Sequence, residues 1–204
     1  MDHPGKEKWI CEATMQQLGR MRAMQYAYHR EFFAWIALVF VLLVVLVVFG
    51  GDRGLCLVPF VVVTAGVQAA FFLHFCDFAR VHAQALEGKL NALLGTRVLM
   101  GAELEADYFY PLPAARIAGF VPSDPGSFFS VYTLHWCALW AAAFAGSLWA
   151  VLARERSPDK WVLAGLAVVW AAANGGYVAW YFLRGTATRR MAAQLGERLH
   201  RQLD

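Results

Sequence analysis

Hydrophobic positions along the chain are concentrated in four long runs separated by polar segments. The runs cover residues 32–49, 55–78, 128–152 and 161–183. A helix needs about 20 mostly apolar residues to cross a hydrocarbon core about 30 Å thick, and each run is close to that length or above it. The pattern therefore predicts four transmembrane helices.

Short polar segments join these runs in pairs. Residues 50–54 (GGDRG) separate the first two runs, and residues 154–160 (RERSPDK) separate the last two. Connections this short join antiparallel neighbours in helical bundles. We therefore predict two transmembrane hairpins, residues 31–78 and 128–183, whose turns lie on the same side of the membrane.

The polar remainder of the chain has the spacing of amphipathic helices, because apolar residues recur in it every three or four positions. Four prolines in one stretch interrupt that spacing and indicate an irregular connector. We predict three cytoplasmic segments: an N-terminal helix within residues 1–30, a helix over 79–107 with a Pro-rich connector to 127, and a tail helix within 184–204.

Composition supports the membrane class. Hydrophobic residues make up 59% of the 204 residues and charged residues 16%, whereas soluble domains average about 45–50% and 25%. The first thirty residues are polar and lack the pattern of a signal peptide. The predicted fold class is therefore all-α integral membrane, with the lipid bilayer as surroundings. The net charge of +3 is evenly spread, so we expect no nucleic-acid partner.

The distribution of basic residues predicts the orientation. Of the 18 Lys and Arg residues, only Arg53, Arg154, Arg156 and Lys160 lie on the side of the two hairpin turns. Segments rich in Lys and Arg stay in the cytoplasm. We therefore predict a multi-pass protein of the cell inner (plasma) membrane with both termini and the middle segment inside.

Two carboxamides interrupt the apolar runs near mid-membrane, Gln68 in the second and Asn174 in the fourth. Thr64 lies four residues before Gln68, and Tyr177 lies three residues after Asn174, so each amide has a polar neighbour on its own helix face. A carboxamide in hydrocarbon must find polar partners. The four residues are therefore candidates either for hydrogen bonds between helices or for the lining of a hydrated path.

Small residues in the fourth run, Gly165, Ala172 and Gly176, would let another helix approach closely. They predict that the third and fourth helices form a packed pair, within one subunit or between subunits. The first run, rich in Val, Leu and Phe, has the composition of a lipid-facing helix. The amphipathic segments are too short to fold alone, so we expect a homo-oligomer or a cytoplasmic protein partner.

Four histidines fall near one membrane face: His29, His74, His82 and His135. Two imidazoles on facing helices could ligate haem iron, and mixed His, Cys and Asp sets could hold a metal. However, the chain has no CxxCH or HExxH motif and no His pair at i, i+4. We therefore expect no metal and no cofactor, with haem b as the alternative.

The first part of the chain, residues 8–95, resembles the SLATT family of two-helix membrane domains. The resemblance lies in the helix that leads into Tyr28-His29-Arg30, the tight hairpin, and the segment FCDFARVHAQALEGKLNALL after the second run. It implies a pore-forming effector of bacterial defence or nucleotide signalling. The second hairpin and the Pro-rich connector depart from the family pattern, and the resemblance implies no functional residue.

The sequence carries no phosphate-binding loop, GxSxG motif, dinucleotide fingerprint or carboxylate pair within the apolar runs. We therefore do not expect an enzyme. The preferred function is an oligomeric channel or pore-type membrane effector. The alternatives are a membrane-anchoring subunit that recruits a cytoplasmic partner, and a haem b electron-transfer subunit.

Overall fold

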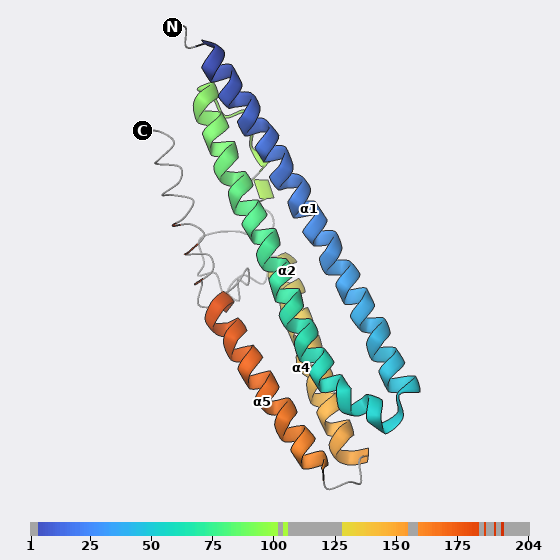
Figure 1. Ribbon diagram of the computed structural model, residues 1–204. Helices are drawn as coiled ribbons and strands as arrows, with labels where there is room; N and C mark the ends of the chain where they lie inside the picture. The colour runs from blue at the N-terminus through green and yellow to red at the C-terminus, as the bar shows by residue number, and fades with distance from the viewer. Residues whose placement is uncertain are drawn as a thin grey trace.

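The computed structural model describes residues 4–101, 104–105, 128–154 and 159–183, together with residues 186, 190 and 193. This part of the chain is all-helical, with α1 (Pro4–Phe49), α2 (Gly51–Leu94), α4 (Phe128–Arg154), α5 (Lys160–Val178) and the π-helical turn η1 (Ala179–Leu183) (Figure 1). Four of these helices are long and apolar enough to cross a membrane. The all-α class is confirmed, and four helices of sufficient length and apolarity at the predicted runs fit a multi-pass membrane protein.

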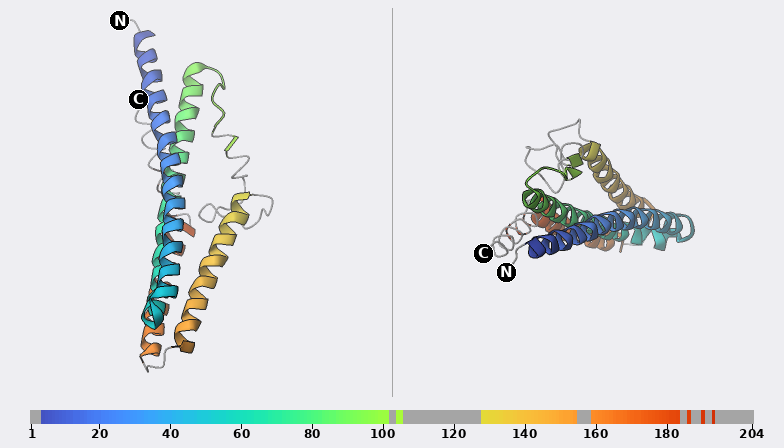
Figure 2. Two further views of the ribbon diagram at one scale, coloured as in Figure 1. Left: turned by 90° about the vertical axis from the view of Figure 1, so that its right-hand side faces the viewer. Right: turned by 90° about the horizontal axis from the view of Figure 1, so that it is seen from above.

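Helices α1 and α2 are about twice as long as a membrane span. They contain 46 and 44 residues, which corresponds to about 65–70 Å at 1.5 Å per residue, against a hydrocarbon core of about 30 Å. Their outer halves lie side by side beyond the start of α4 (Figures 1 and 2). We call this projecting part, residues 4–30 of α1 and 79–94 of α2, the stalk.

A repeat with alternating steps of three and four residues holds α1 against α2 through both the apolar part and the stalk. Buried residues recur along α2 at steps of four and three, with one double step of seven between Ala69 and Cys76. They are Val58, Val62, Ala65, Ala69, Cys76, Ala79, Ala83, Leu86 and Leu90. This spacing is that of coiled-coil seams, in which one face of a helix stays against its partner over many turns. One hydrogen bond reinforces the seam, from the Trp35 indole N–H to the Ala65 carbonyl at 3.2 Å.

The turn between α1 and α2 depends on glycine. Gly51 has φ +56°, and a Cβ on Gly50 or Gly54 would overlap the Leu46 carbonyl oxygen. Helix α2 begins at Gly51, four residues before the start of the apolar run at residue 55. Figure 1 places this turn at the same end of the molecule as the end of α4 and the start of α5.

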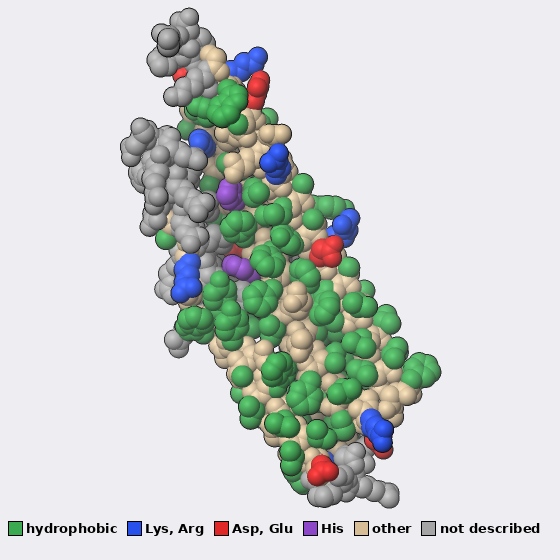
Figure 3. All heavy atoms as spheres, viewed as in Figure 1, with side chains coloured by type: hydrophobic (Ala, Val, Ile, Leu, Met, Phe, Trp, Pro, Cys, Tyr) green, Lys and Arg blue, Asp and Glu red, His purple; other side chains and the backbone are tan. Residues whose placement is uncertain are grey.

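Helix α2 is the centre of the structure. It packs against α1, α4 and α5, whereas α4 and α5 contact each other less than either contacts α2. The small residues of the fourth run predicted that α4 and α5 pack closely. Within one chain, each of these helices instead packs more extensively against α2 than against the other. Hydrophobic side chains cover the surface where the four helices run together, and charged ones gather along the stalk and at the turns (Figure 3).

Helix α2 ends at Leu94, so the predicted helix over 79–107 is too long. Gly95 takes the left-handed conformation (φ +66°) and its N–H bonds the Ala92 carbonyl at 3.3 Å. Helix α1 is unbroken from Pro4 to Phe49, so the segment before the first apolar run and that run form one helix. The Pro-rich connector from 108 and the predicted tail helix 184–204, apart from residues 186, 190 and 193, lie outside the described residues.

Candidate functional site

The candidate site is the seam between α2 and α5, which run in the same direction (Figure 1). Two ring contacts fix their register: Phe71 lies 6.5 Å from Tyr177, and His74 lies 5.8 Å from Tyr181, between ring centroids. Gln68 is three residues before Phe71, and Asn174 is three residues before Tyr177. The register therefore brings the two predicted carboxamides to the same level of neighbouring helices.

The polar groups of this seam do not hold the two helices together within one chain. The Thr64 hydroxyl donates to the Phe60 carbonyl at 2.8 Å, and the Asn174 amide donates to the Trp170 carbonyl at 2.8 Å. Both bonds run to the residue four positions earlier on the same helix, a local pattern that contributes nothing to the contact between helices. Among the described residues, no hydrogen bond joins the Gln68 carboxamide to another group.

Exposure makes these groups costly in lipid. Gln68 and Asn174 are half-buried, Thr64 is exposed, and Tyr177 is 43% exposed in the single chain. A polar group in hydrocarbon that lacks a partner costs several kcal/mol in the limit of full desolvation. In lipid this cost would fall on Gln68, because Thr64 and Asn174 each bond a carbonyl of their own helix.

Aromatic rings occupy the stalk end of the seam. Tyr177 and Tyr181 are stacked with centroids 5.7 Å apart and an interplanar angle of 5°, and Trp180 lies 6.2 Å from Tyr177. The π-helical turn η1 carries Trp180 and Tyr181 at this position. Trp and Tyr are typical of the level where hydrocarbon gives way to headgroups, and this cluster has that composition.

The predicted packing residues of α5 lie on its exposed face. Gly165, Ala172 and Gly176 are exposed, and a Cβ on either glycine would meet no atom within 4 Å. The residues that α5 buries within the chain are Ala164 and Ala167. Among the described residues, no other helix covers this small-residue face, which leaves it open to lipid or to a second copy.

Each of the four histidines has its own surroundings. The His29 Nδ1–H donates to the Gln25 carbonyl at 2.9 Å, while His74 contacts the rings of Phe75 and Tyr181. His135 is exposed and lies edge-on to the Trp136 ring. The described part of the chain holds no group of three or more His, Cys, Asp or Glu side chains arranged for a metal ion.

His82 lies in the stalk, one turn beyond the predicted end of the second span. The Gln17 side-chain amide of α1 approaches its Nε2 at 3.3 Å, and its Nδ1 is buried. Burial disfavours the charged imidazolium and lowers the pKa of His82 below its ordinary value. Burial thus favours the neutral ring, and Gln17 is the neighbour with which its Nε2 pairs.

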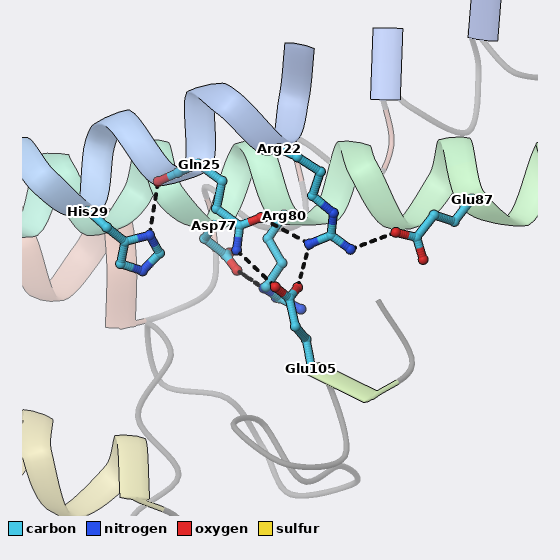
Figure 4. A network of polar contacts seen from close by, with 7 residues as sticks. All are labelled: Arg22, Gln25, His29, Asp77, Arg80, Glu87 and Glu105. Carbon is cyan, nitrogen blue, oxygen red and sulfur yellow. Dashed lines mark hydrogen bonds and ion pairs between the residues drawn. The ribbon is translucent and has the colours of Figure 1, made fainter. Parts of the chain in front are cut away.

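A charged network in the stalk is the feature that sequence reasoning missed (Figure 4). Arg22 of α1 pairs with Glu87 of α2 at 2.6 Å and with Glu105, beyond α2, at 2.7 Å. Burial alone would lower the pKa of Arg22, but the two carboxylates outweigh it and raise the pKa. The only sequence signal is a basic and an acidic residue placed near the apolar stripes of their helices, which does not by itself identify partners.

No protein-family model matches the chain, and searches of curated proteins and of solved structures found no match either.

Proposed function

We propose that this protein is a channel or pore-type component of the bacterial inner membrane that works as a homo-oligomer. The observation that carries the proposal is the α2–α5 seam, where Gln68 and Asn174 share one level without bonding each other. Gln68 bonds no described group and Asn174 bonds only its own helix, and polar side chains that do not bridge helices fit a water-filled path better than a structural brace.

Oligomer formation follows from the same seam. One chain leaves Thr64 and Tyr177 exposed and the two carboxamides half-exposed. A second copy packed beside the seam would remove this polar surface from lipid. The small residues Gly165, Ala172 and Gly176 on the other face of α5 would permit the close helix approach that such an assembly needs.

The orientation belongs to this proposal. The two hairpins would place their turns outside and the stalk in the cytoplasm, together with both termini, because the stalk side carries most of the Lys and Arg residues. The resemblance of residues 8–95 to SLATT domains agrees with an effector of this kind, and a role in bacterial defence is the part of the proposal that rests on that resemblance alone.

An anchoring subunit is the second candidate, and the stalk favours it. Large apolar side chains stand on its outer surface, with Trp9 68%, Met15 51% and Tyr26 73% exposed. Such side chains at a projecting helix are typical of a surface that binds another protein. In that case the membrane part would hold a cytoplasmic partner at the bilayer and would conduct nothing.

The experiment that separates these functions is ion flux into liposomes containing the purified protein. Gln68→Leu and Asn174→Leu keep similar volume and remove all hydrogen bonding of the two side chains. In a hydrated path they create a hydrophobic constriction, which stops conduction by dewetting. We expect the double variant to remain assembled while its flux falls to the level of empty liposomes.

The matched control is Val44→Leu, a change at an exposed position of α1 that lies outside the α2–α5 seam and outside the small-residue face of α5, which should leave flux unchanged. If the amides only brace helices, each loses on the order of 0.6 kcal/mol of stability and flux does not change. A wild-type protein that passes no ions contradicts the channel and favours the anchoring subunit.

A further inference from the structure

The chain that leaves α2 does not depart from the stalk but folds back along it. After the reversal at Gly95, the Asn91 side chain holds the returning backbone with three hydrogen bonds. Its amide donates to the Leu99 carbonyl at 2.7 Å, and its oxygen accepts from the backbone N–H groups of Val98 and Leu99 at 3.1 and 2.9 Å. The side chain of Asn91 thus binds both backbone N–H and backbone C=O groups of the returning segment.

The returning segment also completes the stalk core. Leu99 packs against the buried cluster of Leu18, Ala83, Leu86 and Leu90. Gly101 passes so close to the charged network that a Cβ there would lie 3.3 Å from both Arg22 Nη2 and Glu87 Oε1. The segment is therefore a built part of the stalk, seated between α1 and α2.

Arg22 joins this segment to both helices (Figure 4). Its guanidinium donates to Glu87 at 2.6 Å, to Glu105 at 2.7 Å and to the Gln25 side-chain oxygen at 3.1 Å. The two carboxylates differ in surroundings, since the Glu87 side chain is 8% exposed and that of Glu105 is 29% exposed. Glu87 belongs to α2 and pairs α2 with α1, whereas Glu105 is the outermost described residue of the returning segment.

We propose that residues 95–101 and 104–105 form a clasp closed by the pair Arg22–Glu105, and that opening of this pair frees residues 95–101 from the stalk. The Arg22–Glu87 pair stays closed when the clasp opens, because Glu87 is buried between the helices. Glu105 is the releasable partner, because water and salt reach it and weaken its attraction to Arg22. A partner that competes for Arg22 would therefore open the clasp.

Regulation of ion flux by the clasp rests on the proposed function, whereas the clasp itself does not. Hydrogen exchange of the full chain in lipid nanodiscs measures the clasp without any assay of function. Glu105→Gln removes the charge of one partner and leaves its shape, so the stalk keeps its fold. The control is Glu12→Gln, which removes an exposed pair with Lys8 elsewhere on the stalk (4.0 Å; 79% and 67% exposed).

We expect amide exchange in residues 95–101 to rise by about tenfold or more in Glu105→Gln, with exchange in residues 79–94 unchanged, because a local opening exposes only the groups it releases. Glu12→Gln should match the wild type. Equal exchange of residues 95–101 in wild type and Glu105→Gln overturns the clasp.

In liposomes, altered flux of Glu105→Gln supports its regulatory role, and flux equal to that of a conducting wild type overturns that role alone. A wild type without flux refutes the proposed function, and the exchange result still decides the clasp.

Discussion

Two glycines at the turn between α1 and α2 stand where a side chain would collide with backbone. A Cβ on Gly54 would overlap the Leu46 carbonyl oxygen, and the neighbouring Gly50 would place its Cβ 2.5 Å from the same atom. In contrast, a Cβ on Gly66, twelve residues further along the same helix, would meet no atom within 4 Å. Gly54 and Gly66 therefore lie in the same helix but differ in the space around them.

This difference predicts opposite effects of the same substitution. Gly54→Ala should destabilise the protein by about 1–3 kcal/mol, the usual cost of forced overpacking. Gly66→Ala should be neutral or stabilise it by up to about 1 kcal/mol, since alanine is the better helix former. Thermal unfolding in one detergent, followed by circular dichroism, compares the two. A Gly54→Ala protein as stable as the Gly66→Ala protein would show that the turn is looser than described.

Single residues also show what the sequence can and cannot predict. The sequence picked out Gln68 and Asn174 because polar groups inside apolar runs are visible without a structure. Their common level was not predictable, since it depends on the parallel register of α2 and α5. The Arg22 network was missed for the same reason: its partners lie more than sixty positions away, and no local pattern pairs them.

At the scale of helices, α5 has two faces with different roles. Ala164 and Ala167 are buried within the chain, whereas Gly165, Ala172 and Gly176 line the exposed face. The sequence shows only that small residues are plentiful in this run. Which of them touch a neighbour depends on the rotation of the helix, which is set by the contacts that α2 makes with it.

The two faces predict two kinds of damage. Ala167→Leu should misfold the subunit, because Ala167 is 1% exposed and overpacking costs about 1–3 kcal/mol. Gly176→Leu should leave the subunit folded and weaken assembly, because the added side chain meets nothing within one chain and would separate neighbouring chains. Circular dichroism reports folding, and light scattering on the detergent-purified protein reports assembly.

The control for assembly is Val44→Leu, a change at a 44% exposed position of α1, which should affect neither measurement. If Gly176→Leu assembles like Val44→Leu, the small-residue face of α5 contacts lipid, and the oligomer, if formed, uses another surface.

Helix ends illustrate a second limit of sequence patterns. The end of α2 at Leu94 had a signal in Gly95, since glycine is the common residue after a helix in the left-handed conformation. The apolar spacing beyond it nevertheless predicted a helix to residue 107. Likewise, the buried seam of α2 repeats every three or four residues from Leu55 to Leu90, but its many alanines make the repeat hard to distinguish from general apolarity.

At the scale of the molecule, the lengths of the helices indicate how it sits in a membrane. Helices α1 and α2 exceed a hydrocarbon core of about 30 Å roughly twofold, while α4 and α5 match it. The excess lies at one end, in the stalk, where the Arg22 network and the exposed pair Lys8–Glu12 are found. The opposite end holds the turn between α1 and α2, the end of α4 and the start of α5 (Figure 1).

This asymmetry leads to a topology that can be measured. Reporter fusions at Met1, near Asp124 and at Asp204 should all be active in the cytoplasm, because the stalk end carries most of the basic residues. A reporter inserted at Ser157, in the link between α4 and α5, should be active only outside. Enzymes that work on one side of the membrane, such as a periplasmic phosphatase and a cytoplasmic galactosidase, serve as paired reporters. An outside signal at Asp124 would require the connector to cross the membrane and would contradict the two hairpins. Inversion of all four signals would keep the hairpins but reverse the orientation, which would place the clasp outside the cell.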